Sequence, residues 1–314
     1  MIPMLAVIAV LAQDPSGTLI VTNKAAGTAS IIDVAAGRVL AELPTGDGPH
    51  EVVASSNGRT AVVTNYGAQT GGNTLTVIDV AGRRVARTID LGQYTRPHGA
   101  AFLPGDSIVA VTSETTRNVV LVRVADGSVV RALPTGEPGS HMLAVTADGS
   151  RIYTGNIPTG NISEINVASG ARTRTFSVPP QPEAVTVSGD GAEVWAGSNA
   201  QGSVSVVMTR DGSATTVLSG LGWPYRILLT PDGRRALVPD YRGGSLRIVD
   251  RATRAERARV ALSGPQGIAV SADSRFAFVS LPNDDAIAVV DLDGARVIRQ
   301  LPAGSRPDGI AWVR

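Results

Sequence analysis

Residues 49–55 read PHEVVAS: a proline, a variable residue, a third residue that is small in most copies, and an apolar run. The same pattern returns six more times along the chain. The further copies are PHGAAFL from Pro97, SHMLAVT from Ser140, PEAVTVS from Pro182, PYRILLT from Pro224, PQGIAVS from Pro265 and PDGIAWV from Pro307. Successive copies start 48, 43, 42, 42, 41 and 42 residues apart, which is the period of propeller blades. The pattern therefore predicts seven equivalent units.

Each unit reads as four short strands, labelled a to d, that are bounded by turn residues. Strand a is the apolar run, and a tight turn such as Asn57-Gly58 supplies the positive φ that a hairpin to strand b requires. Residues 61–65 are typical of strand b, residues 74–79 of strand c and residues 38–43 of strand d. No helical period is sustained, so the sequence predicts an all-β protein.

The order of the strands along the chain predicts a closed ring. The repeats begin on a strand b at residues 18–23 and end on a strand a at residues 309–313. We expect the C-terminal strand to complete the first blade, because closure removes the exposed edges of an open array. The prediction is a seven-bladed β-propeller of four-stranded antiparallel blades, formed as a single domain by residues 18–314.

The first 17 residues read as a leader. Residues 4–12 (MLAVIAVLA) form an apolar run, and polar residues resume at Gln13. This run is shorter than a transmembrane helix, which needs about 20 residues, but it suits the core of a signal peptide that is cleaved near Ala12. The first three residues carry no charged side chain, so a short strand packed against the domain is the alternative. The pattern predicts export to the periplasm or the cell exterior.

The composition excludes several classes of protein. The chain has no Cys, which rules out disulfides, thiolate metal sites and Cys nucleophiles. With 28 basic and 27 acidic residues the net charge is +1, so no overall field attracts nucleic acid or an anionic membrane. Hydrophobic residues make up 43% of the chain, which is enough for a core and excludes disorder. The chain contains no P-loop, dinucleotide fingerprint or GxSxG elbow.

Short motifs recur inside the predicted blades. They are VTN at 21–23 and 63–65, GTASIIDV at 27–34, NTLTVIDV at 73–80 and PQGIAVS at 265–271. With these motifs the chain resembles the YVTN-repeat (YncE-like) β-propellers, whose pattern overlaps that of lactonase-type propellers. The resemblance covers residues 18–314 and implies the same seven-bladed fold. It implies no single function, because that family includes uncharacterised exported proteins, surface-layer repeats and domains beside redox and hydrolytic enzymes.

Longer loops mark one face of the predicted ring. Strand a begins on this entry face, where the d–a and b–c loops emerge, while the short a–b and c–d turns lie on the opposite turn face. The 48-residue spacing comes from a b–c loop at residues 66–73 and a d–a loop at residues 92–96, both on the entry face. Loops that lengthen on one face of a repeat array mark its binding face. We therefore expect ligands or partners at the entry face.

The three histidines of the chain occupy one structural position, directly after the first residue of a repeat marker. The seven equivalent residues form an inner ring at the predicted mouth of the channel: Asp308, His50, His98, His141, Glu183, Tyr225 and Gln266. Three imidazoles followed by a carboxylate suit one divalent Zn, Cu, Fe or Ni ion. The candidate ligands are His50, His98, His141 and Glu183.

The inner ring also fits two roles that involve no metal. The ring can contact a polar ligand, or it can simply line the channel, with the shared position reflecting common ancestry of the blades. The spacing of the histidine side chains distinguishes these cases from a metal site. Imidazoles within about 5 Å of one another, with open space above them, favour a metal site, whereas imidazoles more than about 8 Å apart exclude a shared ion.

Further residues on the entry face are candidates for ligand contacts. The position after the inner ring is mostly small, but Glu51 and Arg226 interrupt it, either as contacts to a ligand or as an ion pair. Aromatic residues are scarce in the chain, and those in entry-face loops are typical of a recognition surface. The candidate ligand-binding residues are Tyr66, Arg96, Trp223, Tyr225, Arg226, Tyr241, Arg242, Gln266, Arg306 and Asp308.

Two functions follow from these observations. The first is an exported, monomeric propeller without a membrane span that binds a small molecule or a partner protein on the entry face. The second is a metal-dependent enzyme, a lactonase-like hydrolase or an oxidase, in which Glu183 or Glu51 acts as a ligand or a general base. Because basic and acidic residues are nearly equal in number, we expect no nucleic-acid partner for either function.

Overall fold

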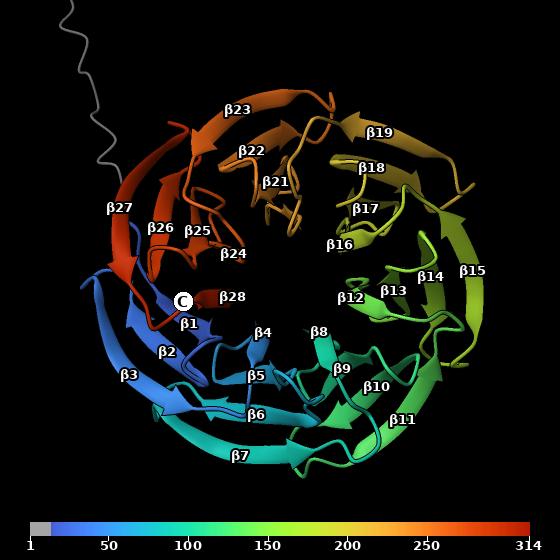
Figure 1. The fold of residues 1–314 in the computed structure, drawn as a ribbon, viewed down its shortest axis with the longest axis horizontal. Coiled ribbons are helices and arrows are strands. Elements are labelled where there is room, and N and C mark those ends of the chain that lie inside the picture. Colours follow the sequence, from blue (N-terminus) through green and yellow to red (C-terminus); the bar gives the residue numbers. More distant parts are fainter. Residues whose placement is uncertain (1–13) are drawn as a thin grey trace, which may run out of the picture.

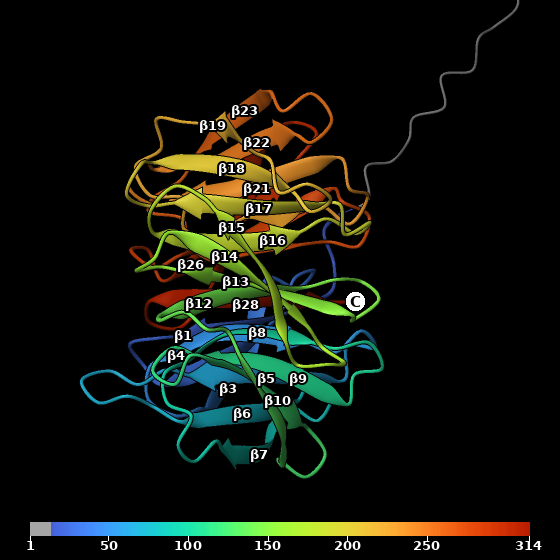
Figure 2. The same ribbon diagram turned by 90° about the vertical axis from the view of Figure 1, so that its right-hand side faces the viewer.

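The structure describes residues 14–314 as a closed ring of seven β-sheets. In this computed structural model each sheet has four antiparallel strands, and the sheets are arranged radially about a central axis (Figure 1). Figure 2 shows the ring from the side, with successive blades stacked on one another. The prediction of a seven-bladed β-propeller is confirmed. Residues 14–314 contain no helix that could cross a membrane. The predicted leader falls largely on residues 1–13, outside the described part of the chain.

Each blade runs from strand a at the axis to strand d at the rim (Figure 1). The a strands are β28 (Pro307–Val313), β4 (Pro49–Ala54), β8 (Pro97–Phe102), β12 (Ser140–Val145), β16 (Pro182–Val187), β20 (Leu228–Leu229) and β24 (Ile268–Val270). The b strands are β1 (Thr18–Asn23), β5 (Thr60–Asn65), β9 (Ile108–Ser113), β13 (Arg151–Asn156), β17 (Glu193–Ser198), β21 (Arg235–Asp240) and β25 (Phe276–Leu281). The c strands are β2 (Thr28–Asp33), β6 (Thr74–Asp79), β10 (Asn118–Arg123), β14 (Asn161–Asn166), β18 (Ser203–Met208), β22 (Ser245–Asp250) and β26 (Ala286–Asp291). The d strands are β3 (Arg38–Pro44), β7 (Arg84–Asp90), β11 (Val129–Pro134), β15 (Arg172–Ser177), β19 (Ala214–Leu218), β23 (Glu256–Ala261) and β27 (Arg296–Pro302).

The ring closes between the two ends of the described chain, as predicted. β28 pairs antiparallel with β1, which places Thr18 opposite Val313 and Val21 opposite Ile310. The C-terminal strand is therefore the innermost strand of the first blade, whose other three strands come from the start of the chain. The first and last repeats are held together by main-chain hydrogen bonds, so neither β1 nor β28 is left as an isolated strand.

Strand a is irregular close to the inner ring. The pairing of β4 with β5 shifts between Pro49 and Val52, and that of β8 with β9 shifts between Pro97 and Ala100. These shifts are β-bulges, which bend a strand and re-aim its side chains. The bulged residues include the inner-ring positions, so the side chains there follow a different direction from the rest of the strand.

Two a strands are shorter than the repeat predicts. The apolar runs that begin at Pro224 and Pro265 give only β20 and β24, of two and three residues. Main-chain hydrogen bonds between strands a and b continue just before these short strands. Tyr225 N, for example, donates to the carbonyl of Pro239 at 2.9 Å. The bulge interrupts the regular ladder in these blades without separating strand a from strand b.

The hydrophobic core lies between neighbouring blades. Leu19 packs with Phe278 of the seventh blade, whereas its neighbour Ile20 packs with Val63 of the second. Successive side chains of a strand point to opposite faces, so each middle strand is buried on both sides. This explains why strands b and c are buried along most of their length, as in β1 and β6.

The Thr of the first VTN motif and its equivalent in the third blade join neighbouring blades at the axis, whereas Thr64 of the second VTN motif accepts from Glu51 N of its own blade at 3.1 Å. The Thr22 hydroxyl lies 3.0 Å from the carbonyl oxygen of His50 in the next blade and 3.2 Å from that of Gly309 in its own. The Thr112 hydroxyl donates in the same way to the carbonyl of His141, at 2.6 Å. The Thr22 and Thr112 hydroxyls thus hold the main chain of His50 and His141 and do not contact the side chains there.

Glycine follows the inner ring where the a strands crowd together. A Cβ on Gly99 would lie 2.7 Å from the main-chain nitrogen of Leu143, and one on Gly309 would lie 2.4 Å from the carbonyl oxygen of His50. Neither glycine has a left-handed backbone, so the requirement is for space. The predicted need for small residues at this position is confirmed for these two blades.

Candidate functional site

The inner ring closes the channel at the entry face and does not form an open mouth. Six of its seven side chains are buried: His50, His98, His141, Glu183, Tyr225 and Asp308. Gln266 is half-buried. The predicted ring of seven residues is therefore a polar layer inside the protein, covered by the entry-face loops.

The three imidazoles lie side by side in this layer. The ring centroids of His50 and His98 are 4.1 Å apart, and those of His98 and His141 are 3.6 Å apart. Both distances fall within the limit set for a shared ion, but all three side chains are buried, so the expected open space above them is not present. The Tyr66 ring packs edge-on against His50 and His98, at 5.6 and 5.4 Å between centroids.

His98 is the central member of the cluster and has unusual surroundings. It is fully buried, and neither Nδ1 nor Nε2 has a hydrogen-bond partner within residues 14–314. Burial, together with the charges of His141 and His50, holds its pKa well below the usual value. His98 is therefore a neutral imidazole with a free lone pair, which is the form that binds metal ions.

His141 is held between two carboxylates. Its Nδ1 is hydrogen-bonded to Glu114, and its Nε2 lies 3.1 Å from Oε1 of Glu183. Burial opposes a positive charge on His141, but Glu183 and Glu114 outweigh it and raise the pKa to about 9. Asn199 in turn donates to Oε2 of Glu183 at 2.9 Å. These contacts fix the orientation of the imidazole and of both carboxylates.

His50 lies beside Lys24 and Asp308. Lys24 Nζ is 2.9 Å from His50 Nε2 and 3.3 Å from Asp308 Oδ2. An ammonium group only donates, so Nε2 of His50 accepts in this contact. His50 Nδ1 is 3.1 Å from Asp308 Oδ2, and the Tyr225 hydroxyl donates to Oδ1 of the same carboxylate at 3.3 Å.

Glu51 and Arg226 form an ion pair one residue further along strand a. Arg226 also donates from Nη1 to the carbonyl of Tyr225 at 2.7 Å and lies 3.7 Å from Oε1 of Glu183. Burial alone would raise the pKa of Glu51, but Arg226 and His50 lower it to about 2. Of the two roles expected for Glu51 and Arg226, the structure contains the ion pair.

A second set of residues, absent from the sequence-based predictions for the inner ring, contacts it. These residues directly follow strand b in their blades: Lys24, Tyr66, Glu114, Asn199 and Tyr241. Lys24, Glu114 and Asn199 bond to His50, His141 and Glu183 respectively. A comparison of the residues that follow each VTN-type tripeptide would have identified this set, because that position repeats with the same period as the inner ring.

Of the predicted ligand contacts, Tyr66 packs against His50 and His98, and Arg96 packs on Tyr66. The Tyr66 hydroxyl donates to Glu114 Oε2 at 2.6 Å, and the guanidinium of Arg96 lies 4.7 Å from the centre of the Tyr66 ring. Arg96 also donates to the carbonyl of Ala68 at 3.3 Å. The two long entry-face loops are thereby joined above the histidine cluster.

Three other predicted ligand contacts, Trp223, Tyr241 and Arg242, form a separate group on the sixth blade. The Arg242 guanidinium lies 4.3 Å from the centre of the Trp223 ring, and Tyr241 packs edge-on against Trp223 at 6.5 Å. Tyr241 also lies 6.1 Å from the Tyr225 ring, which connects the group to the inner ring. Arg306 is exposed, and its main-chain nitrogen donates to Asp285.

Two groups of side chains in this layer have the composition of metal sites. Ligand atoms of His50, Glu51 and His98 all lie within 4.8 Å of one another, as do those of His98, Glu114 and His141. Two atoms bound to one ion at about 2.1 Å are at most about 4.2 Å apart. Ligand atoms around a tetrahedral ion lie about 3.4 Å apart, so both groups must contract to bind one. His98 belongs to both groups.

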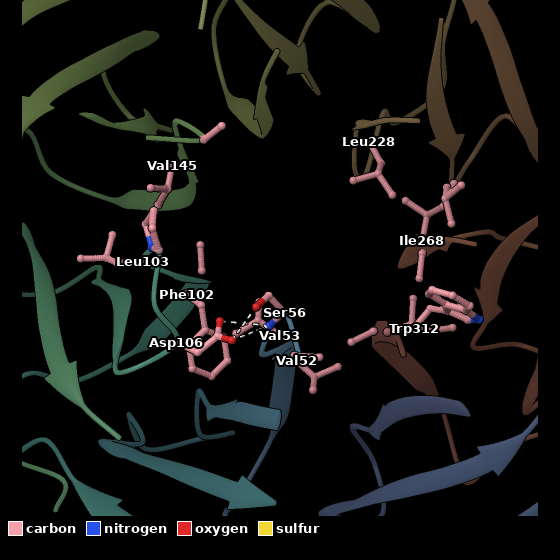
Figure 3. Close-up of a pocket in the computed structure, with 18 of the residues that line it drawn as sticks. Val52, Val53, Ser56, Phe102, Leu103, Asp106, Val145, Leu228, Ile268 and Trp312 are labelled. Carbon is pink, nitrogen blue, oxygen red and sulfur yellow. Dashed lines mark hydrogen bonds between the residues drawn. The ribbon is translucent and has the colours of Figure 1, made fainter. Parts of the chain in front are cut away.

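The cavities of the channel lie on the other side of this layer. A cavity of about 270 Å³ is bounded by Glu51 and Arg226 and continues along the a strands. A second cavity, of about 730 Å³, extends to the a–b turns at Ser56 and Asp106 (Figure 3). The predicted binding face was the entry face, whereas these cavities open toward the turn face.

A profile of the family described as the Choice-of-anchor I domain matches residues 72–308, about three quarters of the chain. A search of curated protein sequences finds no match.

Solved structures with this fold have diverse descriptions. Hydrazine synthase from Kuenenia stuttgartiensis is 16% identical, with a TM-score of 0.78 over 92% of this chain and 99% of that one. A protein of unknown function from Desulfotomaculum acetoxidans is 15% identical, with a TM-score of 0.79 over 95% and 99%. A predicted 6-phosphogluconolactonase from Bacteroides fragilis is 13% identical, with a TM-score of 0.75 over 97% and 99%. At these identities the similarity establishes the propeller fold.

Proposed function

This chain belongs to the Choice-of-anchor I domain family, and we propose that it binds one divalent transition-metal ion in the layer of His50, His98 and His141. The observation that carries the proposal is His98, a fully buried imidazole between two others whose ring nitrogens have no partner within the described residues. An unpaired buried polar group is unfavourable unless something completes it. A metal ion bound by neutral imidazole does so.

The charge of the layer supports a divalent cation. Four carboxylates and two cationic side chains contact the imidazoles or one another: Glu51, Glu114, Glu183 and Asp308, with Lys24 and Arg226. With His141 protonated, as its pKa of about 9 implies, the layer has an excess of one negative charge, and of two once a bound metal ion displaces that proton. A net charge held away from water is unfavourable, and one divalent ion would balance it.

The carboxylates of the layer suit ligation better than general-base catalysis. Burial opposes ionisation of Glu183, but His141 and Arg226 outweigh it and lower its pKa to about 2, the same value as for Glu51. A general base works best with a pKa near the operating pH. We therefore assign Glu51 and Glu183 to binding and orienting an ion. An ion held there would supply a Lewis acid to a group in the channel.

Replacing His98 by Ala is expected to abolish metal binding. Wild-type protein, purified without a His tag and incubated with Zn²⁺, should retain about one ion per chain after gel filtration, and His98→Ala less than about a tenth of that. Zinc at a hundredfold excess over its dissociation constant should stabilise the wild type by about 2.7 kcal/mol. Elemental analysis and thermal unfolding provide the two measurements.

Tyr225→Phe is the matched control, because Tyr225 occupies the inner ring and is equally buried but offers no imidazole or carboxylate. Its metal content should equal that of the wild type. Negligible zinc in both wild type and His98→Ala after reconstitution would rule out the metal site.

A second candidate function is the binding of a partner at the entry face. It is supported by Trp223, whose indole Nε1 is buried without a partner in the described chain, and by the exposed Arg242 stacked on it. Trp223→Ala should remove the capture of a partner from an extract of the source organism, with a thermal midpoint within about 2 °C of the wild type. Tyr225 does not suit this test because it is buried in the inner ring. Undiminished capture by Trp223→Ala would place the partner surface elsewhere.

The leader and the family description support a proposal on location. The apolar run at residues 4–12 has the length of a signal-peptide core, and the family is described as a choice-of-anchor domain. We propose that the protein is exported and acts in the periplasm or outside the cell. The VTN motifs at 21–23 and 63–65 support a further proposal, that the chain is related to the YVTN-repeat propellers.

A further inference from the structure

We propose that the central channel binds a neutral, hydrophobic molecule with a carbonyl oxygen, and that this oxygen accepts a hydrogen bond from Arg226 at the closed end of the channel. The molecule would enter from the turn face. The proposal does not require the metal ion.

Most of the side chains that line the channel are apolar. Val52, Val53, Val145, Leu228 and Ile268 line both cavities, and several of them surround the opening in Figure 3. The larger cavity alone, at about 730 Å³, falls within the range of small-molecule sites, roughly 300–1,000 Å³. Hydrophobic walls of this extent favour a ligand with an apolar body.

Arg226 supplies the hydrogen-bond donor at the inner end. Its side chain is 7% exposed, and its Nε is buried without an acceptor among residues 14–314. Nη1 and Nη2 already donate to the carbonyl of Tyr225 and to Glu51, so Nε is the one guanidinium nitrogen of Arg226 without an acceptor in the described residues. A buried donor without an acceptor is destabilising by about 1–3 kcal/mol, which a ligand oxygen would recover.

The ion pair at the inner end selects against a charged ligand. A carboxylate brought to Arg226 would meet Glu51 beside it, and an ammonium group brought to Glu51 would meet Arg226. Either charged ligand would therefore lie next to a group of its own sign in a region of low dielectric, which is unfavourable. A carbonyl oxygen accepts from Nε without disturbing the pair, so the ligand class is a ketone, ester, lactone or amide with an apolar remainder.

Three probes with similar tails and different head groups test this selectivity: nonan-2-one, nonanoate and nonylammonium. Calorimetry in buffer with a metal chelator should give a dissociation constant for the ketone at least about tenfold lower than for either ion. Equal affinities for the three probes would overturn the proposal, because they would indicate non-specific partition into an apolar surface.

Two variants locate the site. Leu228→Trp fills part of the channel and should abolish ketone binding, with the zinc content of the wild type. Arg226→Lys keeps the positive charge but removes Nε–H, and should weaken ketone binding by about tenfold. The control is Arg242→Ala on the entry face, which should bind the ketone as the wild type does.

These measurements separate the channel from the metal site. His98→Ala should lose zinc and retain ketone binding, whereas Leu228→Trp should do the opposite. Ketone affinity that is unchanged in a folded Leu228→Trp protein would place the ligand outside the channel and overturn the proposal.

Discussion

A chain that ends at Arg306 should give no cooperative unfolding transition. Removal of β28 takes the innermost strand from the first blade and exposes the edge of β1. It also removes Ile310 and Val313 from the clusters between blades, together with Trp312, which packs against the same core. Each of these side chains is worth about 1.5–3 kcal/mol, and a whole domain is stable by only about 5–15 kcal/mol.

The experiment compares thermal unfolding of the truncated chain with that of a chain lacking Arg314 alone. Arg314 is exposed and lies outside β28, so the shorter deletion should leave the midpoint unchanged. Addition of a peptide of residues 307–314 should restore a transition in the truncated chain. A monomeric truncated protein that unfolds cooperatively at the wild-type midpoint would contradict the role of ring closure.

Replacing Arg226 by Met should lower the free energy of unfolding by about 3–5 kcal/mol at pH 7 in the presence of a chelator. Arg226 pairs with Glu51 and lies 3.7 Å from Glu183. The substitution leaves both carboxylates buried with less compensation, and a buried unpaired charge is strongly unfavourable. Denaturant titration measures the difference.

This loss should depend on pH with a defined sign. The pKa of Glu51 is lowered from 4.5 to about 2 in the folded wild type, where Arg226 and His50 outweigh burial. The stabilisation by this pair is therefore present above about pH 4.5 and is lost as the pH falls toward about 2. The difference between wild type and Arg226→Met should shrink over that range.

Arg84→Met provides the control for Arg226→Met. Arg84 pairs with Asp79 at 2.8 Å, but its side chain is 66% exposed, compared with 7% for Arg226. An exposed pair contributes about 0–1 kcal/mol. Equal losses in the two variants would show that burial of the Arg226 pair has no energetic consequence.

The repeat period determines which parts of this structure are predictable. The blades follow from the 42-residue spacing of the markers, and His50, His98 and His141 share one position in that period. Side chains at one position of a closed array meet at the axis, so their proximity could be expected. The hydrogen-bond partners of these histidines could not be expected from the repeat, because Lys24 and Glu114 occupy the same position in the period but carry opposite charges.

The lengths of the loops did not predict the face of the ring to which the channel cavities open. Long entry-face loops indicate a site built by loops, but the cavities are lined by strand a. Val52, Val53 and Leu228 fit the pattern of core residues in the sequence, and nothing in a single repeat distinguishes a side chain that faces a neighbouring blade from one that borders the axis. The bulges next to the inner ring add to the difficulty, because they change side-chain direction without changing the apolar pattern.

The Thr22 and Thr112 hydroxyls have a consequence for how such a protein can evolve. They bind the main chain of His50 and His141 and make no demand on the side chains there. Duplicated blades can therefore diverge at the axis one substitution at a time while the scaffold is preserved. Inner-ring side chains as different as His50, Glu183 and Tyr225 can thus occupy equivalent positions on one common main-chain frame.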